Sequence, residues 1–248
     1  MIRFLYGYRT IALVSFLRYN VNMAPDFVRS KLTVLLLILI LVPVSLSADF
    51  GDDFKWAAMG SIFYFAADNG PSADPPAILP TAGFSASWQI NGPLRLEVTE
   101  DIYFTNYEFN FDRGYPMACN PENRSAFVIG FVTAVQLTGN FTLGYNGTAI
   151  RVYGGPAADF RIVTLALGLH PNDMTDAQQQ TDAIFEYFWS NGRWFNPVLG
   201  TGMDFPLNEH YMLGFDLRVW LPAYKIWNND NTPAIDGWRF GIGLRITP

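Results

Sequence analysis

Residues that commonly carry catalytic chemistry are scarce in this 248-residue sequence, which has two histidines and one cysteine. A single cysteine, Cys119, can form neither an intrachain disulfide nor a cysteine-based metal site. His170 and His210 are isolated, and isolated histidines are usually structural or solvated. A lipid-modifying enzyme would need a serine that the fold brings next to one of these histidines, and this alternative remains open. Otherwise the sequence predicts no enzyme, with no catalytic residue, no metal site and no cofactor.

Charged side chains instead follow an alternating pattern along the chain. Only 15% of the residues are charged, and in several segments they stand at every second position, between large apolar residues. Residues at every second position share one face of a β-strand, so each segment has a charged face and an apolar face. The candidate functional residues are those on the charged faces: Arg95, Glu97, Asp101, Arg151, Asp159, Arg161, Asp204, Asp216, Arg218, Arg239 and Arg245.

We interpret these eleven residues as the lining of a barrel lumen, and two roles remain open for them. Both signs of charge are present, so the charges can pair, as they must in a confined interior. They form either a structural ion-pair network that closes the lumen or a polar path for permeation. Gly214 lies on the charged face and Phe215 on the apolar face. We expect Gly214→Ser to cost much less stability than Phe215→Arg.

Segments with this period predict eight antiparallel strands joined by connections of alternating length. The strands are expected at about 53–66, 81–90, 94–105, 124–144, 148–168, 194–205, 210–222 and 236–247. Short connections at 91–93, 145–147 and 206–209 alternate with long ones at 67–80, 106–123, 169–193 and 223–235. Within 94–105, Glu100 is the one charged residue on the apolar face.

The alternation of loop lengths distinguishes two all-β folds. A soluble sandwich has the same two kinds of face, but short turns at one end and long loops at the other are typical of an outer-membrane barrel. We therefore predict an all-β fold, an eight-stranded antiparallel transmembrane β-barrel. Good helix formers with spaced apolar residues at 175–190 predict a short amphipathic helix in the third long loop.

The composition agrees with a protein that crosses a membrane with strands. Half of the residues are hydrophobic and 16% are aromatic, which excludes a disordered chain. The one long apolar run is at 32–42, whereas a multi-span helical protein needs several runs of about 20 residues. Five of the 16 basic residues but one of the 22 acidic ones precede residue 48, which leaves 11 basic and 21 acidic residues. Such an acidic surface is a poor partner for nucleic acid.

The N-terminal segment has the form of a leader. Basic residues at 29–31 precede the apolar run, Pro43 ends it, and Ser45 and Ser47 occupy the −3 and −1 positions of a cleavage site. We expect 1–47 to be an N-terminal extension and cleavable signal peptide, with the functional start at Met23, and 48–248 to be the outer-membrane barrel. A transmembrane anchor is the alternative, although the apolar run is short for a span.

Residues 199–221 (LGTGMDFPLNEHYMLGFDLRVWL) resemble the OmpW-like family of small eight-stranded outer-membrane channels. Gly200, Gly202 and Asp204 lead into a tight turn at 207–208, and an aromatic-rich strand follows. Residues 151–155 resemble that family's fifth strand and 238–245 its closing strand. The resemblance implies a barrel that helps small, often hydrophobic, molecules to cross the outer membrane, including by leaving sideways through the wall.

Taken together, the sequence predicts a bacterial outer-membrane protein, exported through its signal peptide. Its expected function is that of a narrow channel or porin for small solutes, hydrophobic ones included. The alternative is a surface adhesin whose long loops bind host surface or matrix proteins. The expected partners are outer-membrane lipids, small solutes and the barrel-assembly machinery, although the chain ends in Ile246-Thr247-Pro248 where the usual assembly signal ends in an aromatic residue.

Overall fold

The computed structural model describes residues 54–65, 78–119, 126–144, 146–166, 168, 174–228 and 236–248. The chain divides into two units, 1–52 and 53–248. The expected leader at 1–47, the start at Met23 and the isolated His170 lie outside the described residues.

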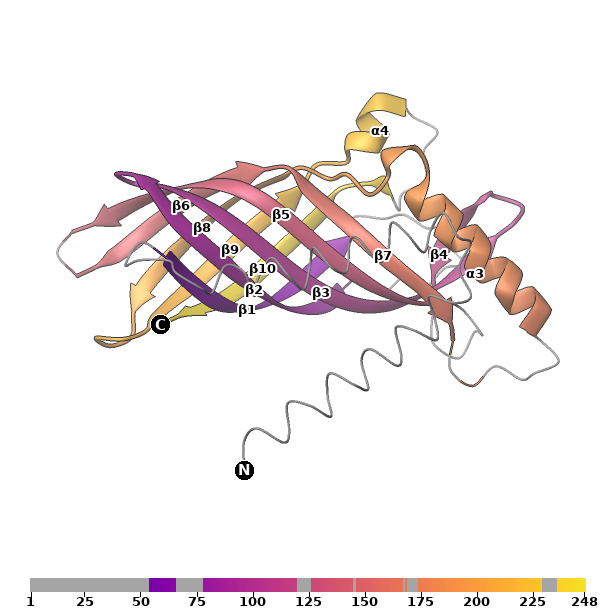
Figure 1. Ribbon diagram of the computed structural model, residues 1–248, viewed down its shortest axis with the longest axis horizontal. Coiled ribbons are helices and arrows are strands. Elements are labelled where there is room, and N and C mark those ends of the chain that lie inside the picture. The colour runs from indigo at the N-terminus through magenta and orange to yellow at the C-terminus, as the bar shows by residue number, and fades with distance from the viewer. Residues whose placement is uncertain are drawn as a thin grey trace. The chain divides into compact units, whose positions relative to one another are not determined.

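The described part of the second unit consists mainly of strands (Figure 1). The strands are β1 (Phe54–Phe65), β2 (Ile78–Asn91), β3 (Leu94–Asn110), β4 (Tyr115–Ala118), β5 (Ala126–Leu143), β6 (Thr148–Gly155), β7 (Ala157–Leu165), β8 (Val198–Pro206), β9 (Met212–Trp220) and β10 (Arg239–Thr247). The helical elements are α3 (Met174–Trp189), the 3-10 turn η3 (Ser190–Gly192) and α4 (Ala223–Asn228). Among the described residues, no helix is long and apolar enough to cross a membrane.

The antiparallel sheet closes on itself. β1 pairs with both β2 and β10, and the order continues through β9, β8, β6, β5 and β3 back to β2. β6 and β7 form one continuous span opposite β5: proline has no N–H, but the Pro156 carbonyl accepts a hydrogen bond from Val135 N at 3.0 Å. Leu137 opposes Gly154 before the proline and Ala134 opposes Ala157 after it, so the register is unbroken. The predicted eight-stranded antiparallel β-barrel is confirmed.

Alternation along the strands separates an apolar outside from a polar inside. On β10, Phe240, Ile242, Leu244 and Ile246 are between 43% and 65% exposed, whereas Arg239 and Arg245 are buried. The other strands also expose large apolar side chains on this outer face. A closed wall whose outer face is apolar is unfavourable in water and favourable in the hydrocarbon of a bilayer. The barrel therefore spans a membrane.

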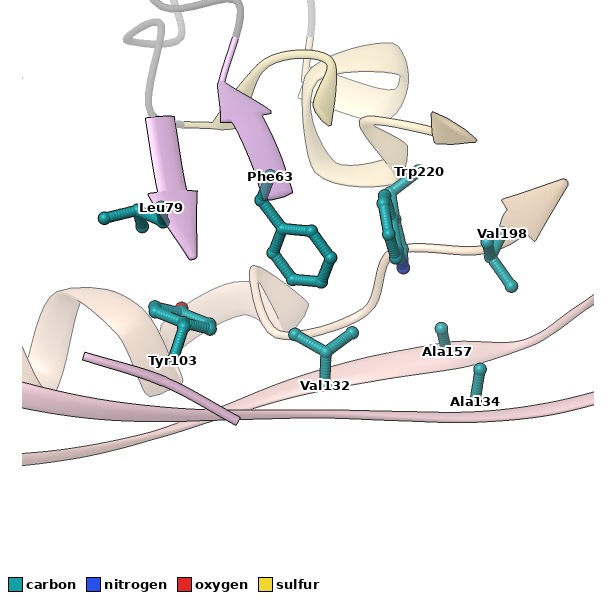
Figure 2. Packing of buried hydrophobic residues seen from close by; sticks show 8 residues of the cluster. All are labelled: Phe63, Leu79, Tyr103, Val132, Ala134, Ala157, Val198 and Trp220. Atoms are coloured by element: carbon teal, nitrogen blue, oxygen red, sulfur yellow. The ribbon is translucent and has the colours of Figure 1, made fainter. Parts of the chain in front are cut away.

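An aromatic cluster fills the interior toward the end that carries the long connections, called here the loop end (Figure 2). The ring centroids of Phe63 and Trp220 lie 4.7 Å apart, and those of Phe63 and Tyr103 lie 6.3 Å apart. The remaining members are Leu79, Val132, Ala134, Ala157 and Val198. Eight strands enclose a space that side chains can fill, and this cluster fills it.

Glycines at inward positions of β9 and β10 provide the room that long side chains occupy. A Cβ atom on Gly243 would lie 2.6 Å from Ser61 Oγ, and one on Gly241 would lie 2.8 Å from the Trp220 ring. At Gly214 the added atom would meet Arg245 Cγ at 2.4 Å. The expectation that Gly214 accepts serine at little cost is therefore wrong, because the arginine stem already occupies that space.

Several connections differ from their predicted form. Residues 106–110, expected in a long loop, continue β3 and pair with β4, so this connection contains a hairpin. Residues 223–228, also expected in a loop, form α4. The helix predicted at 175–190 is confirmed as α3, one residue earlier at each end. The β3–β4 hairpin, α3, η3 and α4 are together called here the cap. The hairpin contacts α3, and α4 contacts Arg193, and strand periodicity reports neither contact.

Candidate functional site

All eleven predicted lumen residues lie inside the barrel. Ten of them are 7% exposed or less, and the Asp204 side chain is 15% exposed. Their positions follow from the strand period, which turns every second side chain inward. The guanidinium of Arg95 bonds to the hydroxyl and carbonyl of Ser87, both at 3.1 Å. The other ten form three groups of ion pairs.

The first group lies toward the end with the short turns, called the turn end. Arg245 contacts Glu97 at 2.8 Å and Asp216 at 3.0 Å. Arg151 contacts Asp204 at 2.7 Å and the same Asp216 at 3.0 Å. Asp216 thus joins two arginines, each of which also has a carboxylate of its own.

The second group crosses the middle of the lumen. Arg218 on β9 pairs with Asp101 on β3, with its NH2 nitrogen 3.2 Å from Oδ1. The same guanidinium donates to the Ser61 hydroxyl, and the Thr81 hydroxyl donates to Asp101 at 3.2 Å. The pair therefore spans the barrel interior between strands that are not neighbours in the sheet.

The third group lies beside the aromatic cluster. Asp159 pairs with Arg161 at 2.6 Å and with Arg239. The Tyr103 hydroxyl donates to Asp159 at 3.0 Å and accepts from Arg161 Nε at 2.9 Å. The strand alternation turns Tyr103 inward together with Glu97 and Asp101, but its partners on β7 could be found only from the strand order. Together, the three groups and the aromatic cluster occupy the lumen at successive levels.

Helix α3 covers the inner wall at the loop end. Its Ile184 and Phe188 are buried together with Tyr107 of β3 and Val128 of β5. The guanidinium of Arg161 lies 4.1 Å from the centre of the Phe188 ring. In Figure 1, α3 lies at the end of the barrel that carries β4 and the end of β7. Because both Tyr107 and Val128 point inward, α3 acts as a lid over the apolar mouth.

One part of the barrel wall is closed by this lid rather than by a strand. Among the described residues, backbone hydrogen bonds join the outer edge of β7 to the chain before β8 at Ala157 and Asp159. Beyond Asp159, no strand among the described residues pairs with this edge, and the indole of Trp189 donates to the Arg161 carbonyl at 3.1 Å. Phe160 stacks on Trp189 at 5.8 Å and on Trp194 at 6.2 Å between centroids.

A second contact holds the lid to the rest of the cap. The Arg193 guanidinium lies between two rings, 3.9 Å from the centre of Tyr187 on α3 and 4.2 Å from that of Tyr224 on α4. Asp236 accepts hydrogen bonds from Tyr187 at 2.7 Å and from Arg193 at 3.3 Å. Burial raises the pKa of Asp236 above its ordinary value, against the lowering effects of the Tyr187 hydrogen bond and the Arg193 charge. This clamp joins four separate parts of the sequence, and no local pattern indicates it.

Glu100 lies on the lipid side of β3, as the misfit in the sequence pattern indicated. Its neighbours across the sheet are Phe84 on β2 and Thr133 on β5. The Thr133 hydroxyl donates to the Glu100 carboxyl at 2.6 Å, and the side chain is buried among its neighbours. An ionisable group on the lipid face is costly, so Glu100 is an unusual feature of this wall.

Among the described residues, the lumen offers ion pairs and apolar contacts. His210 is exposed in the turn between β8 and β9, where its backbone N–H donates to Asn208 Oδ1 at 2.8 Å. In the part of the chain that the structure describes, no three residues that commonly ligate metals are grouped.

Comparison with known proteins finds similar architectures. No protein-family model and no curated protein matches the sequence. The N-terminal β-barrel domain of Pseudomonas aeruginosa OprF has 11% identity and a TM-score of 0.40, over 80% of this chain and 98% of that one. Neisserial surface protein A has 13% identity and a TM-score of 0.44, over 80% and 97%.

A third solved structure is Ail, the attachment invasion locus protein of Yersinia pestis, in complex with the heparin analogue sucrose octasulfate. It has 6% identity and a TM-score of 0.43, over 78% of this chain and 96% of that one. At these identities, function has to be argued from the residues of this chain.

Proposed function

We propose that this chain is an outer-membrane barrel that transfers small hydrophobic solutes through the wall beside β7. The observation that carries the proposal is the outer edge of β7 beyond Asp159, which is covered by the Trp189 side chain instead of a strand. Displacement of α3 would open this edge without breaking any strand pairing, whereas an opening elsewhere in the wall would break a ladder of backbone hydrogen bonds.

A straight path along the barrel axis is less favourable. It would have to separate buried pairs such as Arg218–Asp101 and Arg239–Asp159, and breaking a buried ion pair costs about 3–5 kcal/mol. The narrow channel expected from the sequence is therefore proposed as a side route that begins at the loop end. Membership of the OmpW-like family, proposed on residues 199–221, would imply the same kind of exit.

The lining of this route selects the class of solute. Tyr107 and Val128 on the inner wall pack with Ile184 and Phe188 of the lid, and Phe160 lies on the outer wall. These side chains offer apolar area and ring faces, which favour flat or aliphatic solutes of low polarity.

Uptake of a hydrophobic dye tests the proposal. N-phenyl-1-naphthylamine fluoresces in hydrocarbon, so its rate of entry into the outer membrane of expressing cells reports the transfer. Trp189→Ala removes the cover of the β7 edge and should raise this rate, while Phe111→Ala, in an exposed position on the β3–β4 turn, should not change it. Equal rates for both variants and for cells without the protein would refute the side route.

Adhesion is the second candidate, and a specific observation favours it. The β3–β4 hairpin presents Phe111, which is 54% exposed, on a barrel whose interior is filled. If the barrel is only a scaffold, Phe111→Ser should weaken binding to immobilised host matrix proteins and leave dye uptake unchanged. Unchanged binding together with altered dye uptake in Phe111→Ser would rule out adhesion through this hairpin.

Export to the outer membrane is part of the same proposal, with outer-membrane lipids and the barrel-assembly machinery as partners. If synthesis starts at Met23 and cleavage follows Ser47, the mature chain begins Ala48-Asp49-Phe50. Mass spectrometry of membrane-extracted protein should find this terminus. Finding residues 1–22 in the mature protein would refute both the start and the cleavage site.

A further inference from the structure

Helix α4 has a packed start and an exposed end. At its start Ala223 is buried and the Tyr224 ring stacks on Arg193. At its end Ile226 is 63% exposed and Trp227 is 74% exposed. Trp227 is more exposed than Ile242, the most exposed residue of the β10 lipid face at 65%. Two neighbouring large apolar side chains with this much exposed area usually mark a contact surface.

The position of α4 restricts what can cover this pair. The helix begins three residues after the end of β9, where Leu221 N donates to the Pro197 carbonyl at 2.8 Å and holds the chain at the end of the wall. A six-residue helix is about 9 Å long, and each interfacial layer of a bilayer is about 5–8 Å thick. Trp227 therefore stays within reach of the interfacial layer.

The direction in which α4 projects agrees with this placement. In Figure 1, α4 lies outside the outline of the barrel strands, at the same end of the barrel as α3. The lipid-facing surface continues toward it, because Trp238, at the loop end just before β10, is also exposed on the outside. The exposed apolar end of α4 is thus an extension of the lipid-facing wall.

We propose that α4 is an interfacial anchor that inserts Ile226 and Trp227 into the outer leaflet beside the barrel. Indole rings favour the boundary between headgroups and hydrocarbon, and a helix at this boundary binds more strongly as it buries more apolar area there. Lys225, which is partly exposed, can extend its charge toward the anionic headgroup phosphates. The occupant of this surface is lipid rather than a protein partner.

The anchor is also connected to the lid. Tyr224 of α4 and Tyr187 of α3 stack on opposite sides of the same Arg193 guanidinium. A displacement of α4 by the lipid around it therefore acts on α3 through this clamp. The lipid contact itself is independent of the proposed solute route, and it can be tested without any transport measurement.

Fluorescence quenching in nanodiscs tests the anchor on the full-length mature barrel. Trp227→Cys is labelled with an environment-sensitive thiol dye, and Phe111→Cys is the matched control, since Phe111 is also exposed at the loop end. Labelling of the unsubstituted chain measures any contribution from the native Cys119, which is buried. Ile226→Cys provides a second reporter if the tryptophan variant folds poorly.

The two quenchers distinguish lipid from water. Lipids with a spin label near the headgroup should quench the dye at 227 several-fold more than the dye at 111, and aqueous iodide should show the opposite order. Equal iodide quenching at both sites, with no quenching by the labelled lipid, would overturn the anchor. Protection from both quenchers at 227 would also overturn it, since a protein surface would then cover the helix.

Discussion

Replacing Asp159 by alanine is the strongest test of the filled lumen. Asp159 is the carboxylate partner of both Arg161 and Arg239, and it accepts the Tyr103 hydroxyl. Among the described residues, neither arginine has a second carboxylate within ion-pair distance. Because both guanidinium groups are buried, Asp159→Ala leaves two uncompensated charges, and we expect it to cost at least about 3–5 kcal/mol of unfolding free energy.

Asp216→Ala is the matched comparison. Asp216 also joins two arginines, but Arg151 keeps Asp204 at 2.7 Å and Arg245 keeps Glu97 at 2.8 Å. We expect a loss of about 1.5–3 kcal/mol, the range for hydrogen bonds to charged groups. Urea unfolding in lipid vesicles measures both losses, and planar-bilayer recording measures current.

Which of the two substitutions costs more unfolding free energy shows whether the lumen is filled and dry. A cost for Asp159→Ala no larger than that for Asp216→Ala would refute the reasoning, since it would mean that the arginines are hydrated. New current from either variant with little loss of stability would favour a water-filled path instead. In a double-mutant cycle with Arg239→Met, a coupling energy near zero would show that the pair makes no net contribution.

Four further substitutions test other parts of the structure. Phe215→Arg on the lipid face should cost about 2–4 kcal/mol in urea unfolding, and Gly214→Ser should cost about 1–3 kcal/mol through overpacking against Arg245; a neutral Gly214→Ser would mean that the interior is loose. Glu100→Gln should stabilise the barrel at pH 7 by up to about 2 kcal/mol, since it removes an ionisable group from the lipid face while keeping an acceptor; a loss of stability would mean that the carboxylate has a favourable partner. Because the folded-state pKa of Asp236 is raised, its contribution to cap stability should decline as the pH rises from about 4 through that pKa. Hydrogen exchange of α3 should lose this pH dependence in Asp236→Asn, and an unchanged profile would contradict the assignment.

The barrel and its inward-facing residues could be predicted because both depend on local periodicity. Arg239 and Arg245 on alternate positions of one strand are enough to place both side chains on one face. Loop lengths then separate a transmembrane barrel from a sandwich. The same alternation predicts that Glu100 lies on the apolar face, where a charge is unfavourable. The structure confirms this position.

The partners of these residues could not be predicted, because they are set by closure of the barrel. Arg218 and Asp101 are 117 residues apart in the sequence and lie on strands that do not pair. The space at Gly214 depends on an arginine of the next strand, which the glycine's own neighbours do not reveal. The Arg193 clamp needs an arginine, two tyrosines and an aspartate from four separate segments, and strand periodicity contains no information on any of them.

The ion pairs across the lumen have a consequence for assembly. Arg218–Asp101 joins β9 to β3, and Arg239–Asp159 joins β10 to β7, so neither pair exists in a partly formed sheet. Until β10 meets β1, Arg218, Asp101 and Arg239 lack these partners, whereas Asp159 has only Arg161 of its own strand. Hydrocarbon is closed to the unpaired charges. Closure and membrane insertion should therefore occur as one concerted step. A mutation that breaks a lumen pair should then slow assembly as well as weaken the finished barrel.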